Sequence, residues 1–207
     1  LARMLGQKLG DKWGQNVVAD NRSGAGSSIA AAAVAKATPD GYTLLFNSSA
    51  QSINPSLYAK LPYDTLKDFT PVSLMVMVPG VMTMNPSVPA NNLKEVIALA
   101  KANPGKYNYG CPGQLTSGHL SMEMLKYMTG MEIVNVPYKG GAPAVQALVA
   151  GQVQLNLATI STALPQVKAG VLKMLAVSTG KCWPSVPDVP TLAESGVPGY
   201  DYSSWVG

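Results

Sequence analysis

The sequence has few of the residues on which metal and redox chemistry depend. Its 207 residues include two cysteines, Cys111 and Cys182, and one histidine, His119. No Cys-X-X-Cys pair occurs, so a zinc site built from cysteine and histidine is excluded, and we expect no metal and no cofactor. The two cysteines could pair in an oxidising compartment, but their spacing does not require a disulfide.

Charge is scarce as well. Only 13% of the residues are charged, and the net charge is a mild +4. No cluster of five or more lysines and arginines occurs, which argues against nucleic-acid binding, and the small positive excess favours anionic ligands only weakly. No apolar run approaches the ~18 residues that a membrane-spanning helix needs. With 47% hydrophobic residues, the chain is long enough to fold as one large or two small domains.

Both ends of the sequence are abrupt. Apolar residues recur at helical spacing from Leu1 to Trp13 with no capping residue before them, and the last residues, 204–207, lie inside a strand-like run. We therefore expect a fragment of a longer protein, so the absence of a signal peptide carries no information about the compartment.

Helix and strand patterns alternate along the whole chain. Helices are expected over 1–13, 27–37, 55–59, 93–103, 120–130, 142–150 and 163–169. Strands are expected over 16–19, 42–46, 70–84 with an interruption at Pro79-Gly80, 107–109, 133–136, 152–157 and 172–178. Short strands separated by helices predict an α/β fold with a mainly parallel sheet.

The proline- and glycine-rich breaks predict two lobes. The first lobe is expected over 1–78, with 191–207 returning to it, and the second over 84–179. The crossovers are expected at about 78–84 and 179–190. Two crossovers between α/β lobes imply a hinge with a cleft between them, and ligands of open α/β sheets bind beyond the carboxyl ends of the strands.

Two loops carry the strongest signal for a ligand. In Val136-Pro137-Tyr138-Lys139-Gly140-Gly141-Ala142-Pro143-Ala144, a short strand stops at a proline, and a lysine and two glycines precede a helix. Residues 109–117 repeat this design. Backbone N–H groups at such a helix start carry partial positive charge and favour an anion held by main chain. Lys139 is either a ligand for a carboxylate or a solvated loop charge.

Polar residues also follow the strands expected at 42–46 and 152–157. The candidate ligand-binding residues are Ser48, Ser49, Gly110, Cys111, Gly113, Thr116, Ser117, Tyr138, Lys139, Gly140, Gly141, Ala142, Thr159 and Ser161. Together they predict a ligand gripped from several strand ends.

Two sharper interpretations are less favoured. Gly24-Ala25-Gly26 after a predicted strand is similar to a dinucleotide fingerprint, but the third glycine position is Ile29, which favours a simple strand-to-helix turn. Cys111 and His119 invite a nucleophile–base interpretation, but the sequence offers no third residue to orient the base, so we expect no catalytic residues.

Several motifs resemble one family in order along the chain. They are Asn21-Arg22-Ser23-Gly24-Ala25-Gly26, Thr38-Pro39-Asp40-Gly41-Tyr42-Thr43-Leu44-Leu45, Ile53-Asn54-Pro55-Ser56-Leu57-Tyr58, Leu61-Pro62-Tyr63-Asp64, Asp68-Phe69-Thr70-Pro71-Val72-Ser73, Asn108-Tyr109-Gly110, Thr116-Ser117, His119-Leu120, the 136–144 loop and Pro187-Asp188-Val189-Pro190-Thr191. The chain thereby resembles the extracytoplasmic solute receptors of tripartite tricarboxylate transporters, also called Bug-type receptors.

The resemblance implies a periplasmic binding protein with two α/β lobes of the type II, Venus-flytrap architecture, truncated at both ends. It implies a monomer that traps a small organic carboxylate in the interlobe cleft and delivers it to the permease subunits of the transporter. It also implies that a first strand with a glycine-rich carboxylate-gripping loop precedes Leu1, and that further helices follow Gly207.

The sequence departs from the family pattern at two places. The loop that is usually Ser-Ser-Gly-X-Gly-Thr reads Cys111-Pro112-Gly113-Gln114-Leu115-Thr116, which stiffens it and makes it more apolar. After the 152–157 strand, where an acidic or amide residue is common, the run is Ala158-Thr159-Ile160-Ser161. These changes favour a carboxylate with an apolar or aromatic body rather than citrate.

The expected function is therefore a carboxylate-binding receptor and not an enzyme. The first alternative is the ligand-sensing domain of a transcription regulator, which shares a two-lobed architecture but needs a DNA-binding segment. The second is a small α/β enzyme, which needs an acid–base constellation that one histidine and scattered carboxylates do not supply.

Overall fold

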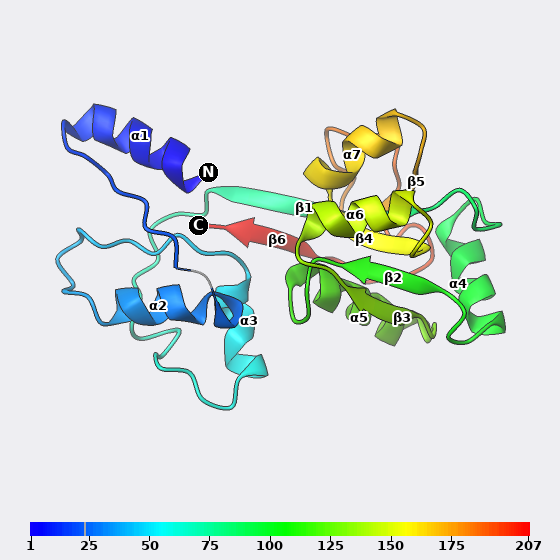
Figure 1. Ribbon diagram of the computed structural model, residues 1–207, viewed down its shortest axis with the longest axis horizontal. Coiled ribbons are helices and arrows are strands. Elements are labelled where there is room, and N and C mark those ends of the chain that lie inside the picture. Colours follow the sequence, from blue (N-terminus) through cyan, green and yellow to red (C-terminus); the bar gives the residue numbers. More distant parts are fainter. Residues whose placement is uncertain (23) are drawn as a thin grey trace. The chain divides into compact units, whose positions relative to one another are not determined.

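The computed structural model describes residues 1–22 and 24–207 (Figure 1). Ser23, which belongs to the first family motif and to the predicted 21–26 loop, lies outside the described residues. By its internal contacts the chain forms two compact units. The first comprises Leu1–Met75 with Val206–Gly207, and the second comprises Val76–Trp205.

The first unit is helical. It contains α1 (Ala2–Trp13), the short 3₁₀ helix η1 (Ala25–Ser27), α2 (Ser28–Ala35) and α3 (Ala50–Leu57). Helix α1 ends at Gly14, which adopts the left-handed conformation with φ of 66° and donates its N–H to the Gly10 carbonyl. Helix α3 begins at Ala50 rather than at the predicted residue 55, because the Gln51 and Ser52 N–H groups already donate to Ser48 and Ser49. Pro55 therefore lies inside the helix.

The strands predicted over 16–19 and 42–46 do not form. Residues 16–19 and 44–46 have no regular secondary structure, and residues 42 and 43 lie in a bend. Large side chains in both segments are exposed to solvent: Val18 is 85% and Tyr42 is 94% exposed. A strand persists only when a neighbouring strand takes its N–H and C=O groups, and no described residue of this unit pairs with either segment. The β-type pairing recorded in this unit joins Ser48 to Val206, beside reciprocal hydrogen bonds between Asn47 and Gly207.

The second unit is built on a six-stranded sheet. Its strands are β1 (Val76–Met84), β2 (Asn108–Cys111), β3 (Val134–Pro137), β4 (Leu155–Thr159), β5 (Lys173–Val177) and β6 (Ser203–Val206), of which the last residue, Val206, is counted with the first unit. The order is β3-β2-β4-β1-β5, and β6 pairs with β1. Strand β2 is parallel to β3 and β4, whereas β1 is antiparallel to β4 and β5.

The sheet is therefore mixed, and the prediction of a mainly parallel sheet was wrong for β1. Strands β2, β3, β4 and β5 follow one another through helical crossovers, which impose a common direction. Strand β1 enters the sheet directly after Met75 and lies between β4 and β5 in the opposite direction.

The segment predicted as the first crossover is part of β1, which runs without a break through Pro79-Gly80. Gly80 pairs with Thr159, and its N–H donates to the Ser178 hydroxyl oxygen at 2.8 Å. A Cβ atom at position 80 would lie 2.5 Å from the Leu157 side chain, so the glycine marks a close approach and not a chain break.

Residues 191–205 belong to the second unit, whereas the prediction returned 191–207 to the first lobe. Thr191 bridges to Val177 on β5, and Leu192, Val197 and Tyr200 are buried in the core. The apolar side chains of this segment thus have their partners on the nearby sheet. The division into two hinged lobes remains a prediction.

Helices cover both faces of this sheet (Figure 1). They are α4 (Leu93–Ala102), α5 (Ser117–Thr129), α6 (Gly141–Val149) and α7 (Ile160–Lys168). One core cluster joins α4 and α5 to Met82, Tyr109 and Leu155, and another joins α6 and α7 to Val81 and Val177. Strand β4 begins later than predicted, because the N–H groups of residues 151 and 152 still close the end of α6.

Candidate ligand-binding site

Three helix N-termini meet at one edge of the sheet. The neighbouring parallel strands β3, β2 and β4 are followed directly by α6, α5 and α7, respectively. The residues that precede the helices, Gly140, Thr116 and Thr159, form no side-chain capping hydrogen bond. The first-turn N–H groups have no acceptor inside their helices, so this edge carries donors and partial positive charge.

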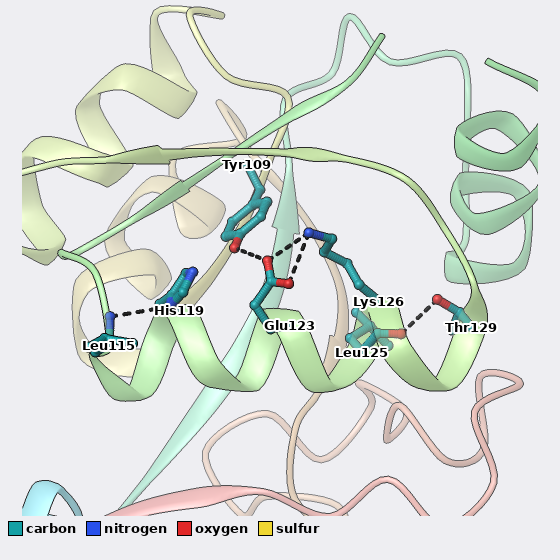
Figure 2. Close-up of polar contacts among 7 residues, drawn as sticks. All are labelled: Tyr109, Leu115, His119, Glu123, Leu125, Lys126 and Thr129. Carbon is teal, nitrogen blue, oxygen red and sulfur yellow. Dashed lines mark hydrogen bonds and ion pairs between the residues drawn. The ribbon is translucent and has the colours of Figure 1, made fainter. Parts of the chain in front are cut away.

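The β2–α5 loop is held by its own side chains. The Thr116 hydroxyl donates to the Gly113 carbonyl at 2.7 Å. The Leu115 N–H donates to His119 Nδ1 at 3.2 Å (Figure 2). Leu115 has a φ of 59°, which is unfavourable for a residue with a side chain. The hydroxyl that was predicted to contact the ligand thus shapes the loop, and a ligand role for Thr116 remains a prediction.

The β3–α6 loop lies beside the β2–α5 loop. The Tyr138 N–H donates to the Cys111 carbonyl at 2.9 Å, which ties the two loops together. Gly140 has a φ of 118°, a value that favours glycine, and it ends the loop just before α6. Lys139 and Ala142 are exposed, and Lys139 forms no ion pair within the described residues. The Lys139 charge is therefore open to solvent at this edge.

The second unit has a hollow of about 190 Å³ at the same edge. It is lined by Val78, Gly80, Pro112, Ser117, Gly118, Ser121, Gly141, Asn156, Leu157, Ala158, Thr159, Thr162, Tyr202 and Ser204. Gly118 permits the close approach of the loop to α5, because a Cβ atom there would lie 2.8 Å from Pro112. Most of the lining is nonpolar, and none of these residues is charged.

The hollow brings together part of the predicted site. Ser117, Gly141 and Thr159 line it. Gly110, Cys111, Gly113, Thr116, Tyr138, Lys139, Gly140, Ala142 and Ser161 belong to the same loops and strand ends but are not among the lining residues. The Thr159 hydroxyl lies 3.0 Å from that of Thr162 and 3.4 Å from that of Ser161. These three hydroxyl groups form a small polar cluster at the start of α7.

Ser48 and Ser49 belong to the first unit, where they precede α3. The Ser48 N–H donates to the Asn47 side chain at 2.8 Å, and the Ser49 carbonyl accepts from the Ser52 hydroxyl at 2.9 Å. Ser49 is buried, with 5% of its surface exposed. Their part in a ligand site remains a prediction.

Sequence reasoning missed Ser121, Asn156 and Tyr202, which also line the hollow. No local sequence pattern marks Ser121 or Tyr202 as a site residue. Ser121 lies in the interior of α5, and Tyr202 lies just before β6. Asn156 had a signal that was overlooked: it is a polar residue in the middle of β4, between Leu155 and Leu157.

Cys111 and His119 have separate partners. Cys111 is buried, and its Sγ donates to the Gly113 carbonyl at 3.3 Å, whereas His119 accepts from Leu115. Burial raises the pKa of the Cys111 thiol, which keeps it in the less reactive protonated form. Both Cys111 and the exposed Cys182 are free.

A polar cluster anchors α5 to β2 (Figure 2). The Tyr109 hydroxyl donates to Glu123 Oε1 at 2.6 Å, and Lys126 Nζ donates to the two carboxylate oxygens at 2.7 and 3.0 Å. Burial raises the pKa of Glu123, but the hydrogen bonds from Lys126 and Tyr109 outweigh it and lower the pKa overall. Burial and the Glu123 carboxylate raise the pKa of Tyr109. The cluster is satisfied and fixes the helix whose N-terminus borders the hollow.

A larger hollow of about 430 Å³ lies in the first unit against α1. It is lined by Arg3, Gly6, Gln7, Gly10, Asp11, Gly14, Gln15, Asn16, Val17 and Ala19. It contains none of the predicted site residues and no strand end.

Within residues 1–22 and 24–207, no group of three or more His, Cys, Asp or Glu side chains could hold a metal ion. The helices of these residues are also too short or too polar to cross a membrane.

Comparison with known proteins decides the family. The family model described as the tripartite tricarboxylate transporter family receptor matches residues 1–207. The chain belongs to this family. The family resemblance that the motifs predicted is thus confirmed over the whole length of the chain.

Relatives and solved structures agree with this assignment. Protein BugT of Bordetella pertussis is 38% identical over 99% of the chain, which spans 64% of that protein. The structure of R. palustris Rpa4515 with adipate is 40% identical with a TM-score of 0.87, covering 99% of this chain and 69% of that one. MatC from Rhodopseudomonas palustris with bound malate is 32% identical with a TM-score of 0.84, covering 100% and 70%. The predicted α/β fold of these receptors is confirmed.

The chain spans less than two thirds of the length of the curated relatives, as the 64% coverage of BugT illustrates. It covers 69% of the Rpa4515 structure and 70% of the MatC structure.

Proposed function

We propose that the protein is a solute receptor that binds a small organic carboxylate at the carboxyl edge of β3, β2 and β4. The observation that carries this proposal is the convergence of three helix N-termini without side-chain caps at that edge. Each N–H donated to a charged group contributes roughly 1.5–3 kcal/mol, so a few such bonds account for useful affinity. The adipate and malate bound by two structural neighbours support the same class of ligand.

The proposed contacts come from main-chain N–H groups and hydroxyl groups. Ser117, Gly141 and Thr159 are the predicted residues that line the hollow, and we assign them to the ligand. Gly113 and Gly140, with φ of 138° and 118°, give the loops their shape, and Gly110 lies near the end of β2. Lys139 adds a full positive charge at an exposed position of the same edge. The nonpolar lining, which includes Pro112, favours a ligand with an apolar body.

We further propose that the protein acts in the periplasm and passes its ligand to membrane permease subunits without transforming it. Membership of a transporter receptor family supports this role. The separate partners of Cys111 and His119 favour a receptor over the alternative of an α/β enzyme. The mild net charge of +4 gives no support to the alternative of a regulator that binds DNA.

Pairs of acids and amides test whether the receptor recognises a carboxylate. Isothermal titration calorimetry with adipate and adipamide, succinate and succinamide, and benzoate and benzamide compares ligands of the same body with and without charge. We expect at least one acid to bind at least tenfold more tightly than its amide, because helix N-termini and charged donors reward the anion. If every amide binds as well as its acid, or if no acid binds, the proposed function is wrong.

The Lys139→Gln variant decides between a ligand and a solvated charge at this position. We expect it to weaken binding of the preferred acid about fivefold, which corresponds to ~1 kcal/mol. Lys168→Gln is the matched control, because Lys168 lies at the opposite, C-terminal end of α7. Equal affinities of the two variants would assign Lys139 to the solvated surface.

A further inference from the structure

Asn156 is a buried polar residue that its surroundings leave unsatisfied. It lies on β4 with 1% of its surface exposed. Neither its Oδ1 nor its Nδ2 has a hydrogen-bond partner among the residues that the structure describes. Buried side-chain amides are normally paired with protein or water, so an unpaired one requires an explanation.

The neighbouring strands do not satisfy this amide. On β2 the residue in register is Gly110, which has no side chain. On β1 the residue in register is Thr83, whose hydroxyl donates to the Asn156 main-chain carbonyl at 3.1 Å. Neither in-register neighbour therefore forms a hydrogen bond with the side-chain amide of Asn156.

The position of Asn156 associates it with the hollow at the helix N-termini. Leu155 and Leu157 pack in the cluster on the α4 and α5 face, so alternation along β4 places Asn156 on the face of α6 and α7, together with Ala158. Gly141 and Thr162, from the first turns of α6 and α7, line the hollow with Asn156 and Ala158. A buried, unpaired amide and three helix N-termini therefore border the same space.

The lining of the hollow limits what the occupant can be. Its volume of about 190 Å³ is several times the ~30 Å³ of one water molecule. No charged side chain lines it, so it offers no cation for a second carboxylate. An asparagine amide both donates and accepts, which matches a hydroxyl group, since a hydroxyl also does both.

We propose that Asn156 is a specificity-determining residue that hydrogen-bonds a hydroxyl group on the carbon chain of the ligand. The preferred ligand is then a hydroxy acid: its carboxylate lies at the helix N-termini, and its hydroxyl reaches the Asn156 amide. This proposal rests on the proposed function and adds a second recognition element to it. A site that hydrogen-bonds a ligand hydroxyl rejects the analogue without it, because its buried polar groups are then left unpaired.

Two matched pairs of acids test the proposal by calorimetry on the protein. Succinate and malate differ by one hydroxyl, and so do adipate and 3-hydroxyadipate. We expect the hydroxylated member of at least one pair to bind at least tenfold more tightly. Leucine has a shape similar to that of asparagine but no amide. The Asn156→Leu variant is therefore expected to lose this preference and to bind the unhydroxylated acid within about threefold of the wild-type affinity.

Thr83→Val is the matched control, because it removes a buried hydroxyl from the neighbouring strand without changing a residue that lines the hollow. It is expected to retain the preference for the hydroxylated acid. Asn156→Ala, which removes the amide without adding bulk, replaces the leucine variant if the latter does not fold.

A preference that is absent from the wild type, or that survives in the Asn156 variants, would overturn the role of Asn156. In that case the two acids of a pair still bind, and carboxylate recognition stands. If none of the four acids binds to the wild type, the role of Asn156 fails. The proposed function fails as well only if benzoate, the third acid of the carboxylate test, also does not bind.

Discussion

The two units bury their apolar residues to very different degrees. In the second unit, large side chains such as Met82, Tyr109 and Leu155 are almost completely buried. In the first unit, Val18, Tyr42 and Leu66 are 85%, 94% and 89% exposed. Both regions have alternating helix and strand patterns in the sequence. The difference shows that a strand-like pattern becomes a strand only where a partner strand is available.

The partner strands of the second unit come from nearby sequence. Strands β2, β3, β4 and β5 are each separated by a single helix, so each crossover brings the next strand into the same sheet. Segments 16–19 and 42–46 of the first unit have no such neighbour among residues 1–22 and 24–75. Val17, Val18, Tyr42 and Leu44 therefore remain exposed.

The largest expected difference between the two units is in the rates of amide hydrogen exchange. We expect amides in β1 and β4 to exchange at least about a thousandfold more slowly than those in 16–19 and 42–46, because paired, buried strands open only in near-global unfolding. Exchange measured by mass spectrometry on peptides from both units checks this. Similar protection of the two sets would mean that the predicted strands of the first unit do form.

Truncation of a core leucine should cost far more in the second unit than in the first. Leu155→Ala is expected to lower the free energy of unfolding by about 2–5 kcal/mol, because Leu155 is 1% exposed and the truncation leaves a cavity. The matched variant Leu44→Ala removes a side chain that is 55% exposed, and we expect a change below ~0.5 kcal/mol. Urea denaturation of both variants measures the contrast, and equal losses would contradict it.

A buried tyrosine hydroxyl gives a smaller effect within the second unit. Tyr200 is 1% exposed and donates to the Ser121 carbonyl at 2.8 Å. Tyr200→Phe is expected to cost about 1 kcal/mol of unfolding free energy, since one net hydrogen bond is lost. Tyr127→Phe, at a residue that is 91% exposed, should cost nothing measurable. If Tyr200→Phe leaves the free energy of unfolding unchanged, the hydrogen bond does not stabilise the fold.

The Glu123 cluster predicts the smallest effect, with a defined sign. Because the pKa of Glu123 in the folded protein lies below its usual 4.5, its contribution to stability is present above that value and is lost as pH falls through the lowered pKa. The side chain is 38% exposed, so we expect less than about 1 kcal/mol. The stability difference between wild type and Glu123→Gln should shrink from pH 6 to pH 3. A difference that grows on acidification would reverse the assignment.

The sequence was sufficient for the family, the α/β class and the elements of the second unit. Local signals such as the Gly130 and Gly140 turns lie where helices end and begin, so α5 and α6 were predicted within three residues. The direction of β1 was not predictable, because it depends on long-range pairing with β4 and β5. Pro79-Gly80 was predicted to interrupt the strand, but β1 runs through it. Glycine is needed there because the Leu157 side chain on the neighbouring strand leaves no room for a Cβ atom, a contact that is not local in sequence.

The sequence allowed candidate site residues to be placed in the loops after β2, β3 and β4, because the glycines and the following helices are local features. That these residues bind a ligand remains a prediction. Ser121, Asn156 and Tyr202 were missed, since their place at the hollow follows from how α5, β4 and residue 202 pack. Thr116 was assigned to the ligand, but the Gly113 carbonyl that accepts a hydrogen bond from its hydroxyl becomes apparent only in the folded loop.

The most direct test of carboxylate binding in the second unit is an amide NMR titration. With adipate as the probe, we expect the first-turn amides of α5, α6 and α7, including Ser117, Gly141 and Ser161, to show the largest chemical-shift changes. With adipamide, the same amides should change little. If the largest changes fall instead on residues that line the α1 hollow, such as Gly6 and Val17, the assignment of the site is wrong.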